Sequence, residues 1–138
     1  MRNVERFNFT PIINDFGETT LKPFLPLSLF CQNRTVSVPG LLDSGAEINV
    51  LPYRIGIELG ASWVPETATI KLGGRFNQIP ACPLVVQATV GKFAPVRLAF
   101  AWAENDHVPV ILGQVNFFME FDVCFYRARQ AFELCPRV

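Results

Sequence analysis

Proline and glycine occur along the whole of this sequence, and they restrict it to short segments of secondary structure. The 138 residues include 11 prolines and 9 glycines. Proline interrupts helices and central strands, and glycine commonly marks turns. Between these residues lie short apolar stretches, several of which alternate apolar with polar side chains, as half-buried strands do. The sequence therefore predicts an all-β fold, a small closed barrel or folded sheet with one or two short helices.

The predicted elements follow one another closely. Pro23 and Pro26 place the first long strand at a sheet edge, because proline cannot donate to a ladder. Short helices are predicted over residues 54–59, closed by Gly60, and over residues 114–120. The predicted strands cover residues 18–31, 35–39, 48–51, 67–72, 79–90, 96–102 and 108–112, and a terminal hairpin covers residues 121–134.

The length of the chain fits one domain. Half of the residues are hydrophobic, which is ample material for a core that needs no disulfide or metal to hold it. Residues 1–17 contain Pro11 and Gly17 and are predicted to be an irregular N-terminal arm that could dock onto another molecule. Residues 18–138 are predicted to form the domain.

Composition argues against several classes of function. Twelve acidic residues balance 12 basic ones, and no basic cluster stands out, so neither nucleic acid nor an anionic membrane is an expected partner. The apolar stretches are too short to span a bilayer, and the first residues lack a secretory signal, which predicts a cytoplasmic protein with four reduced thiols. With the single histidine, His107, the usual zinc ligand sets cannot be assembled, and no metal or cofactor is expected.

Asp43 is the acidic residue in the most unusual context. It follows two leucines at the end of a predicted strand and precedes Ser44 and Gly45. A carboxylate that leaves an apolar strand at a glycine-containing turn should be partly desolvated and within reach of backbone N–H groups, as functional carboxylates are. The same tripeptide is also common in ordinary turns. The residues at this position leave both interpretations open.

The neighbouring segments resemble a known family. Residues 41–51 (LLDSGAEINVL) resemble the active-site segment of retropepsin-like aspartic peptidases, in which two hydrophobic residues precede Asp-Thr/Ser-Gly-Ala and a short apolar strand follows. Residues 110–114 (VILGQ) resemble the family's apolar–apolar–Gly segment, which leads into a helix and packs behind the active-site loop. Residues 70–76 (IKLGGRF) resemble the tip of its flap hairpin. The resemblance covers residues 20–135 and implies a retropepsin-like closed barrel, the acid-protease fold.

The resemblance implies an aspartic endopeptidase that hydrolyses peptide or protein substrates. Such chemistry needs two carboxylates that share a proton around one water. Each chain supplies only Asp43, so the resemblance implies a homodimer in which two Asp43 carboxylates meet at a two-fold axis. Ser44 would then hydrogen-bond across the dimer, and Gly45 would let the substrate backbone approach closely.

The resemblance also assigns substrate contacts. Ala46 would line the substrate site, and Gly73 and Gly74 would let the flap bend over a bound peptide, although this pair is equally compatible with a plain hairpin turn. The sequence departs from the retroviral members at Gln114, where they often carry an arginine that supports the dimer. It also continues through a hairpin after the second motif, so the dimer contact is expected to differ from the viral one.

Two alternatives remain open from the sequence. The first is a catalytically silent retropepsin-like module used for dimerisation or peptide binding. The second is an unrelated small β-barrel that binds a ligand or a subunit. Among the other polar residues, His107 is predicted to be solvated, and Glu47 either lines a subsite or faces solvent.

Overall fold

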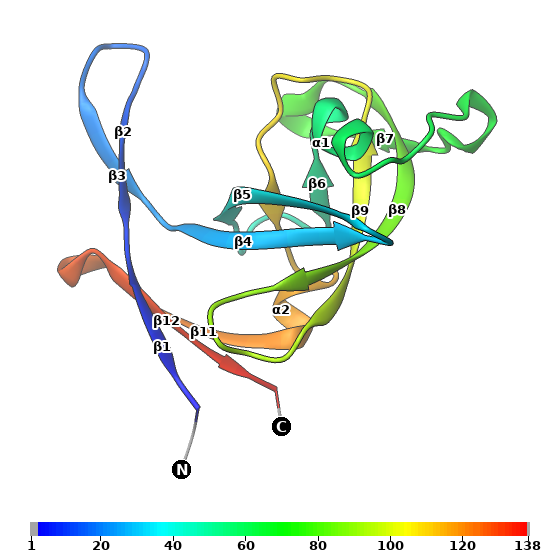
Figure 1. Ribbon diagram of the computed structural model, residues 1–138. Coiled ribbons are helices and arrows are strands. Elements are labelled where there is room, and N and C mark those ends of the chain that lie inside the picture. Colours follow the sequence, from blue (N-terminus) through cyan, green and yellow to red (C-terminus); the bar gives the residue numbers. More distant parts are fainter. Residues whose placement is uncertain (1–2, 138) are drawn as a thin grey trace.

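The barrel is the central feature of the structure (Figure 1). The computed structural model describes residues 3–137, and for Arg75 the backbone alone. In this part of the chain six strands follow the hydrogen-bonded order β4-β5-β10-β6-β9-β8, and pairing of β4 with β8 closes the ring. The predicted all-β closed barrel is confirmed. The barrel strands are β4 (Phe24–Cys31), β5 (Arg34–Leu42), β6 (Asn49–Leu51), β8 (Ile79–Thr89), β9 (Val96–Ala103) and β10 (Ile111–Leu112).

Side-chain alternation explains why these segments form barrel strands. In β8, Val86 and Ala88 are buried in the core, whereas Val85 and Gln87 face outward. The prediction of an edge strand at β4 is wrong, because β4 pairs with β5 along its whole length and with β8 at Ser28–Phe30. Pro26, the proline within β4, is tolerated because it precedes the three residues that pair with β8.

β10 lies between the two strands that flank Asp43. It pairs in parallel with β5, where Leu112 is opposite Leu42, and antiparallel with β6, where Ile111 is opposite Val50. Ile111 and Leu112 are fully buried, as predicted for an apolar segment. The chain that leaves β5 at Asp43 therefore turns in front of β10 before it returns as β6.

The two short helices differ in how well the sequence predicted them. α1 (Tyr53–Glu58) agrees with the prediction, and Gly60 follows it with a φ of +85°, which favours glycine. α2 (Phe117–Glu120) is shorter than the predicted helix over residues 114–120. The reason is that Val115 forms a parallel β-bridge with Ile48, so the chain at this point pairs with the Asp43 loop instead of coiling into a helix.

The N-terminal segment is more regular than predicted. β1 (Glu5–Asn8) pairs with β12 (Ala131–Pro136), and β2 (Thr10–Ile13) pairs with β3 (Thr19–Lys22) in a hairpin. The expectation of irregular backbone over residues 1–17 is therefore wrong for these strands. β11 (Phe121–Tyr126) completes a three-stranded sheet with β1 and β12, which confirms the predicted terminal hairpin. Docking of the N-terminal segment onto another molecule stays a prediction.

The remaining elements are short. β7 (Ile70–Leu72) extends the barrel sheet beyond β8, and 3₁₀ turns cover Pro65–Thr67, Gly74–Phe76 and Arg127–Arg129. None of the helices in the described chain is long and apolar enough to cross a membrane. The four cysteines are free thiols.

Candidate active site

Asp43 is the first residue after β5, and its loop folds around it. The Asp43 N–H donates to the carbonyl oxygen of Leu112 at 3.0 Å, which anchors the start of the loop on β10. The Gly45 N–H donates to Asp43 Oδ1 at 3.0 Å, and the Ala46 N–H donates to the Asp43 carbonyl oxygen at 3.1 Å. These bonds form a tight turn that holds the half-buried carboxylate in one orientation.

The segment after β10 supports this loop from behind, as the resemblance implies. The N–H groups of Gln114 and Val115 donate to the carbonyl oxygens of Ala46 and Glu47 at 2.9 and 2.8 Å. The Gln114 side chain adds a bond of 2.8 Å from Nε2 to the carbonyl oxygen of Ser44. Gln114 therefore ties the loop to a later segment of the same chain.

Asn49 is a supporting residue that the sequence analysis missed. Its side chain is fully buried, and its Oδ1 accepts a hydrogen bond of 2.8 Å from the Gly113 N–H. Its Nδ2 donates to the Ala99 carbonyl oxygen and to Asn116 Oδ1, both at 3.0 Å. A lone amide inside an apolar strand was the available signal, because a buried polar side chain needs partners. Asn49 therefore ties the start of β6 to β9 and to the segment that follows β10.

A cavity of about 340 Å³ opens beside Asp43. Its walls come from the two ends of the chain as well as from the loop, so the N-terminal and C-terminal strands frame the carboxylate. The lining residues are Phe9, Leu21, Pro23, Leu42, Asp43, Ser44, Phe125 and Arg127. Asp43 is thus accessible from a concave, mostly apolar surface, which is the usual setting of a binding site.

A second cavity, of about 430 Å³, is lined by residues that alternate along the chain with those of the first: residues 22, 24 and 41 line the second, and residues 21, 23 and 42 line the first. Phe76 and Ile79 line it from the β7–β8 hairpin, and Leu41 lines it from the strand that leads to Asp43. Lys22 and His107 bring polar groups to its apolar walls. His107 is exposed, as predicted.

Gly73 and Gly74 lie in a loop separate from the one that contains Asp43. The loop joins β7 to β8, and its N–H groups at Phe76, Asn77 and Gln78 donate to carbonyl oxygens of residues 72–74 at 2.8–3.2 Å. Gly74 has a φ of +59°. The structure thus brings Asp43 and residues 44–46 into one loop and places the two glycines at a hairpin tip. Neither glycine lines the two cavities described above, so their contact with a substrate stays a prediction.

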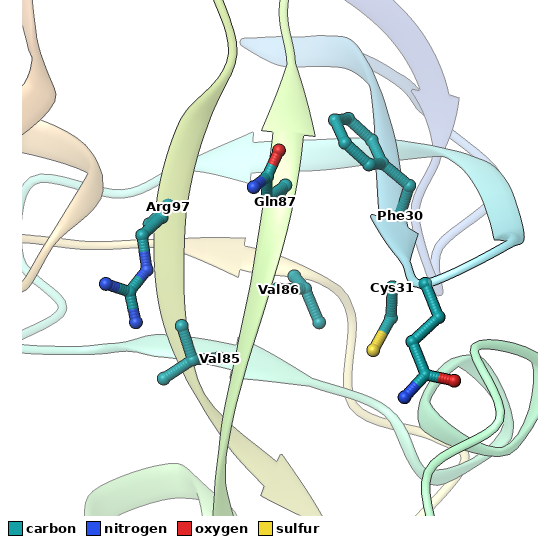
Figure 2. A pocket seen from close by; sticks show the side chains of 7 residues that line it. Phe30, Cys31, Val85, Val86, Gln87 and Arg97 are labelled. Carbon is teal, nitrogen blue, oxygen red and sulfur yellow. The ribbon is translucent and has the colours of Figure 1, made fainter.

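A third cavity, of about 450 Å³, lies where β4 and β8 meet (Figure 2). It is lined by Phe30, Cys31, Gln32, Val85, Val86, Gln87 and Arg97, and it includes none of the predicted site residues. Arg97 is its one charged side chain, so it offers no pair of groups for acid–base work. Within residues 3–137 no three His, Cys, Asp or Glu side chains gather to hold a metal ion.

The fold and the position of the Asp43 loop define a retropepsin-like architecture. The structure is similar to that of a retropepsin-like aspartic protease from Rickettsia conorii, with a TM-score of 0.66 and 16% sequence identity. The match covers 99% of this chain and 94% of that protein's chain. No family model matches the sequence, and no curated protein matches it significantly. The likeness therefore shows the fold, which the sequence predicted from its three motifs.

Proposed function

We propose that this protein is an aspartic endopeptidase that acts as a homodimer, with Asp43 as the catalytic carboxylate of each chain. The observation that carries the proposal is the Asp43 loop, which is bound from behind by Leu112 and Gln114 and opens onto a cavity in front. A carboxylate held this firmly at the edge of a cleft is pre-organised for catalysis. The retropepsin-like fold supports the same reaction class.

The mechanism follows from placing two Asp43 carboxylates around one water. Two like charges a few ångströms apart do not both ionise readily, so the pair holds one proton. The ionised carboxylate removes a proton from water as its oxygen attacks the peptide carbonyl carbon. The protonated carboxylate donates a hydrogen bond to the carbonyl oxygen. A proton then passes to the leaving nitrogen, the C–N bond breaks, and the pair again holds one proton.

The other predicted site residues take roles around this dyad. Ser44 and Gly45 are exposed next to Asp43, where Ser44 would bond across the dimer and Gly45 would let a peptide backbone approach. Ala46 lines the substrate path, and the loop with Gly73 and Gly74 closes over the peptide as a flap. The 430 Å³ cavity would receive an apolar substrate side chain. A cytoplasmic location stays a prediction.

The replacement of Asp43 by asparagine tests the proposal. Asp43→Asn is nearly isosteric and should keep the fold while abolishing cleavage, because an amide cannot take a proton from water. Asp122→Asn, at an exposed position of β11, is the matched control and should cleave like the wild type. Cleavage of an unstructured protein substrate, followed by mass spectrometry, gives the readout.

The same assay separates the proposal from its alternative. A catalytically silent dimerisation or peptide-binding module would bind peptides and form a dimer while cleaving nothing in the wild-type form. Wild-type cleavage that persists in the Asp43→Asn variant would instead show that another group performs the reaction.

A further inference from the structure

The hairpin of β2 and β3 projects from the barrel and ends in exposed apolar side chains (Figure 1). Phe16 at its tip is 87% exposed, and Ile13 at the end of β2 is 73% exposed. Large apolar residues in a projecting element are typical of interaction surfaces. Residues 14–18 form what we call the acidic tip, because Asp15 and Glu18 flank Phe16 there.

The acidic tip is held in one shape before any partner arrives. Asn14 Oδ1 accepts hydrogen bonds from the N–H groups of Phe16 and Glu18 at 3.0 and 2.9 Å. The Asn14 N–H donates to the Glu18 carbonyl oxygen at 2.8 Å, and Gly17 has a φ of +75°, which suits glycine. Phe16 is therefore presented outward on an ordered turn, which lowers the entropic cost of docking it.

A second hairpin carries the opposite charge. Residues 125–129, which we call the basic turn, join β11 to β12 and expose Arg127, Arg129 and part of Phe125, which is 41% exposed. The Arg127 guanidinium lies 5.8 Å from the centre of the Phe9 ring. The acidic tip and the basic turn thus combine apolar side chains with charges of opposite sign, as complementary interface patches do.

Both hairpins border the face that carries Asp43. Leu21 of β3, together with Phe125 and Arg127 of the basic turn, lines the cavity beside Asp43. In Figure 1 both hairpins extend to the same side of the barrel. The four-residue strands of the β2–β3 hairpin reach roughly 13 Å beyond its base. A second chain that brings its own Asp43 to this face must come within reach of both hairpins.

We propose that the acidic tip of one protomer docks onto the basic turn of a second copy, and that the reciprocal contact forms at the same time. A two-fold axis generates both contacts from one pair of patches. Phe16 would pack against Phe125 of the second copy while Asp15 and Glu18 face its two arginines. This inference rests on the proposed function for the presence of a second copy at the Asp43 face, and it names the surface that holds the two chains together.

Charge exchange between the two patches tests the inference. The dimer dissociation constant is measured by sedimentation equilibrium at fixed salt for the wild type and five variants. Asp15→Lys with Glu18→Lys, and separately Arg127→Glu with Arg129→Glu, should each weaken the dimer on the order of tenfold. The chain that carries all four changes should return to within about threefold of the wild type, because the charges are again opposite. Phe16→Ser should weaken the dimer on the order of tenfold, and Val64→Ser, an exposed apolar control elsewhere, should leave it unchanged.

Three results would overturn the inference. The first is a dissociation constant that neither Phe16→Ser nor either charge reversal changes, as expected if the tip binds a different protein. The second is additive weakening of the dimer in the combined variant, and the third is a wild type that is monomeric at every concentration.

Cleavage is measured separately on the wild type and on Asp43→Asn. Dimers with charge rescue but no cleavage would reject the proposed function and keep the interface. If cleavage depends on Asp43 but the dimer dissociation constant is unchanged by the charge reversals and by Phe16→Ser, the interface alone is rejected.

Discussion

The loop after β5 and the loop between β7 and β8 both contain glycines and each contributes to the lining of a cavity, yet their hydrogen bonds differ. The Asp43 loop donates a hydrogen bond to Leu112 and accepts hydrogen bonds from Gln114 and Val115, which belong to a distant part of the chain. The hydrogen bonds described for the β7–β8 loop run within residues 72–78. One loop is hydrogen-bonded to a distant part of the chain, whereas the bonds described for the other close its own turn.

This contrast fits the two tasks of a peptidase site. A catalytic carboxylate has to stay in position, whereas a cover over the substrate has to open and close. The regions that move are drawn from the less stable parts of a fold. The difference therefore indicates that the Asp43 loop would hold the catalytic group and that the β7–β8 loop would admit the substrate.

The strongest way to test the contrast is to add one methyl group to each region. A methyl group at Gly113 would lie 2.5 Å from the Ile48 carbonyl oxygen and 2.8 Å from that of Ala46, whereas nothing lies within 4 Å at Gly73. Gly113→Ala must therefore move the backbone behind Asp43, and we expect it to lower the free energy of unfolding by about 2–4 kcal/mol. Gly73→Ala should change it by less than about 0.5 kcal/mol. Urea denaturation of both variants measures this, and equal losses would contradict the contrast.

The second test stiffens the loop between β7 and β8. Gly74 needs its φ of +59°, which a β-branched residue adopts only with strain. We expect Gly74→Val to lower turnover by about tenfold while reducing the free energy of unfolding by about 1–2 kcal/mol. Gly73→Val is the control, because Gly73 has an extended backbone with a φ of −90°. Hydrogen exchange that finds residues 72–78 as protected as β8 and β9 would contradict a mobile flap.

The smallest expected effect comes from the side-chain contact behind the Asp43 loop. Gln114→Ala removes the bond of 2.8 Å to the Ser44 carbonyl oxygen. One such hydrogen bond is worth about 1 kcal/mol, so we expect a loss of that size in stability and a few-fold loss in turnover. Gln87→Ala, on the exposed face of β8, is the matched control and should match the wild type in both measurements. A Gln114→Ala enzyme with unchanged turnover would show that the loop is fixed by its backbone bonds.

Local patterns carried most of the predictions that succeeded. Alternation over residues 79–90 and 96–102 predicted β8 and β9, and an unbroken apolar stretch predicted the buried β10. The motif around Asp43 predicted a loop backed by the later Gly-containing segment, and the bond from the Asp43 N–H to Leu112 agrees with that geometry.

The features that the sequence did not predict depend on contacts between distant residues. Glu5 of β1 is opposite Leu134 of β12, and nothing in residues 1–17 alone indicates that partner. The predicted helix begins later than Gln114 because Val115 forms a β-bridge with Ile48, a tertiary contact that overrides local helix propensity. The cavity beside Asp43 likewise depends on both chain ends, which no local pattern brings together.

The central claim is that two chains share one pair of Asp43 carboxylates, and a mixing experiment measures it most directly. Wild-type protein and the Asp43→Asn variant are refolded together at equal concentration, so that mixed dimers form at random. If each active unit needs both carboxylates, cleavage per wild-type chain should fall to about half, because half of the wild-type chains then lie in mixed dimers. A larger excess of the variant should suppress it further. Cleavage per wild-type chain that stays constant at every ratio would show that one chain is sufficient and would contradict the shared dyad.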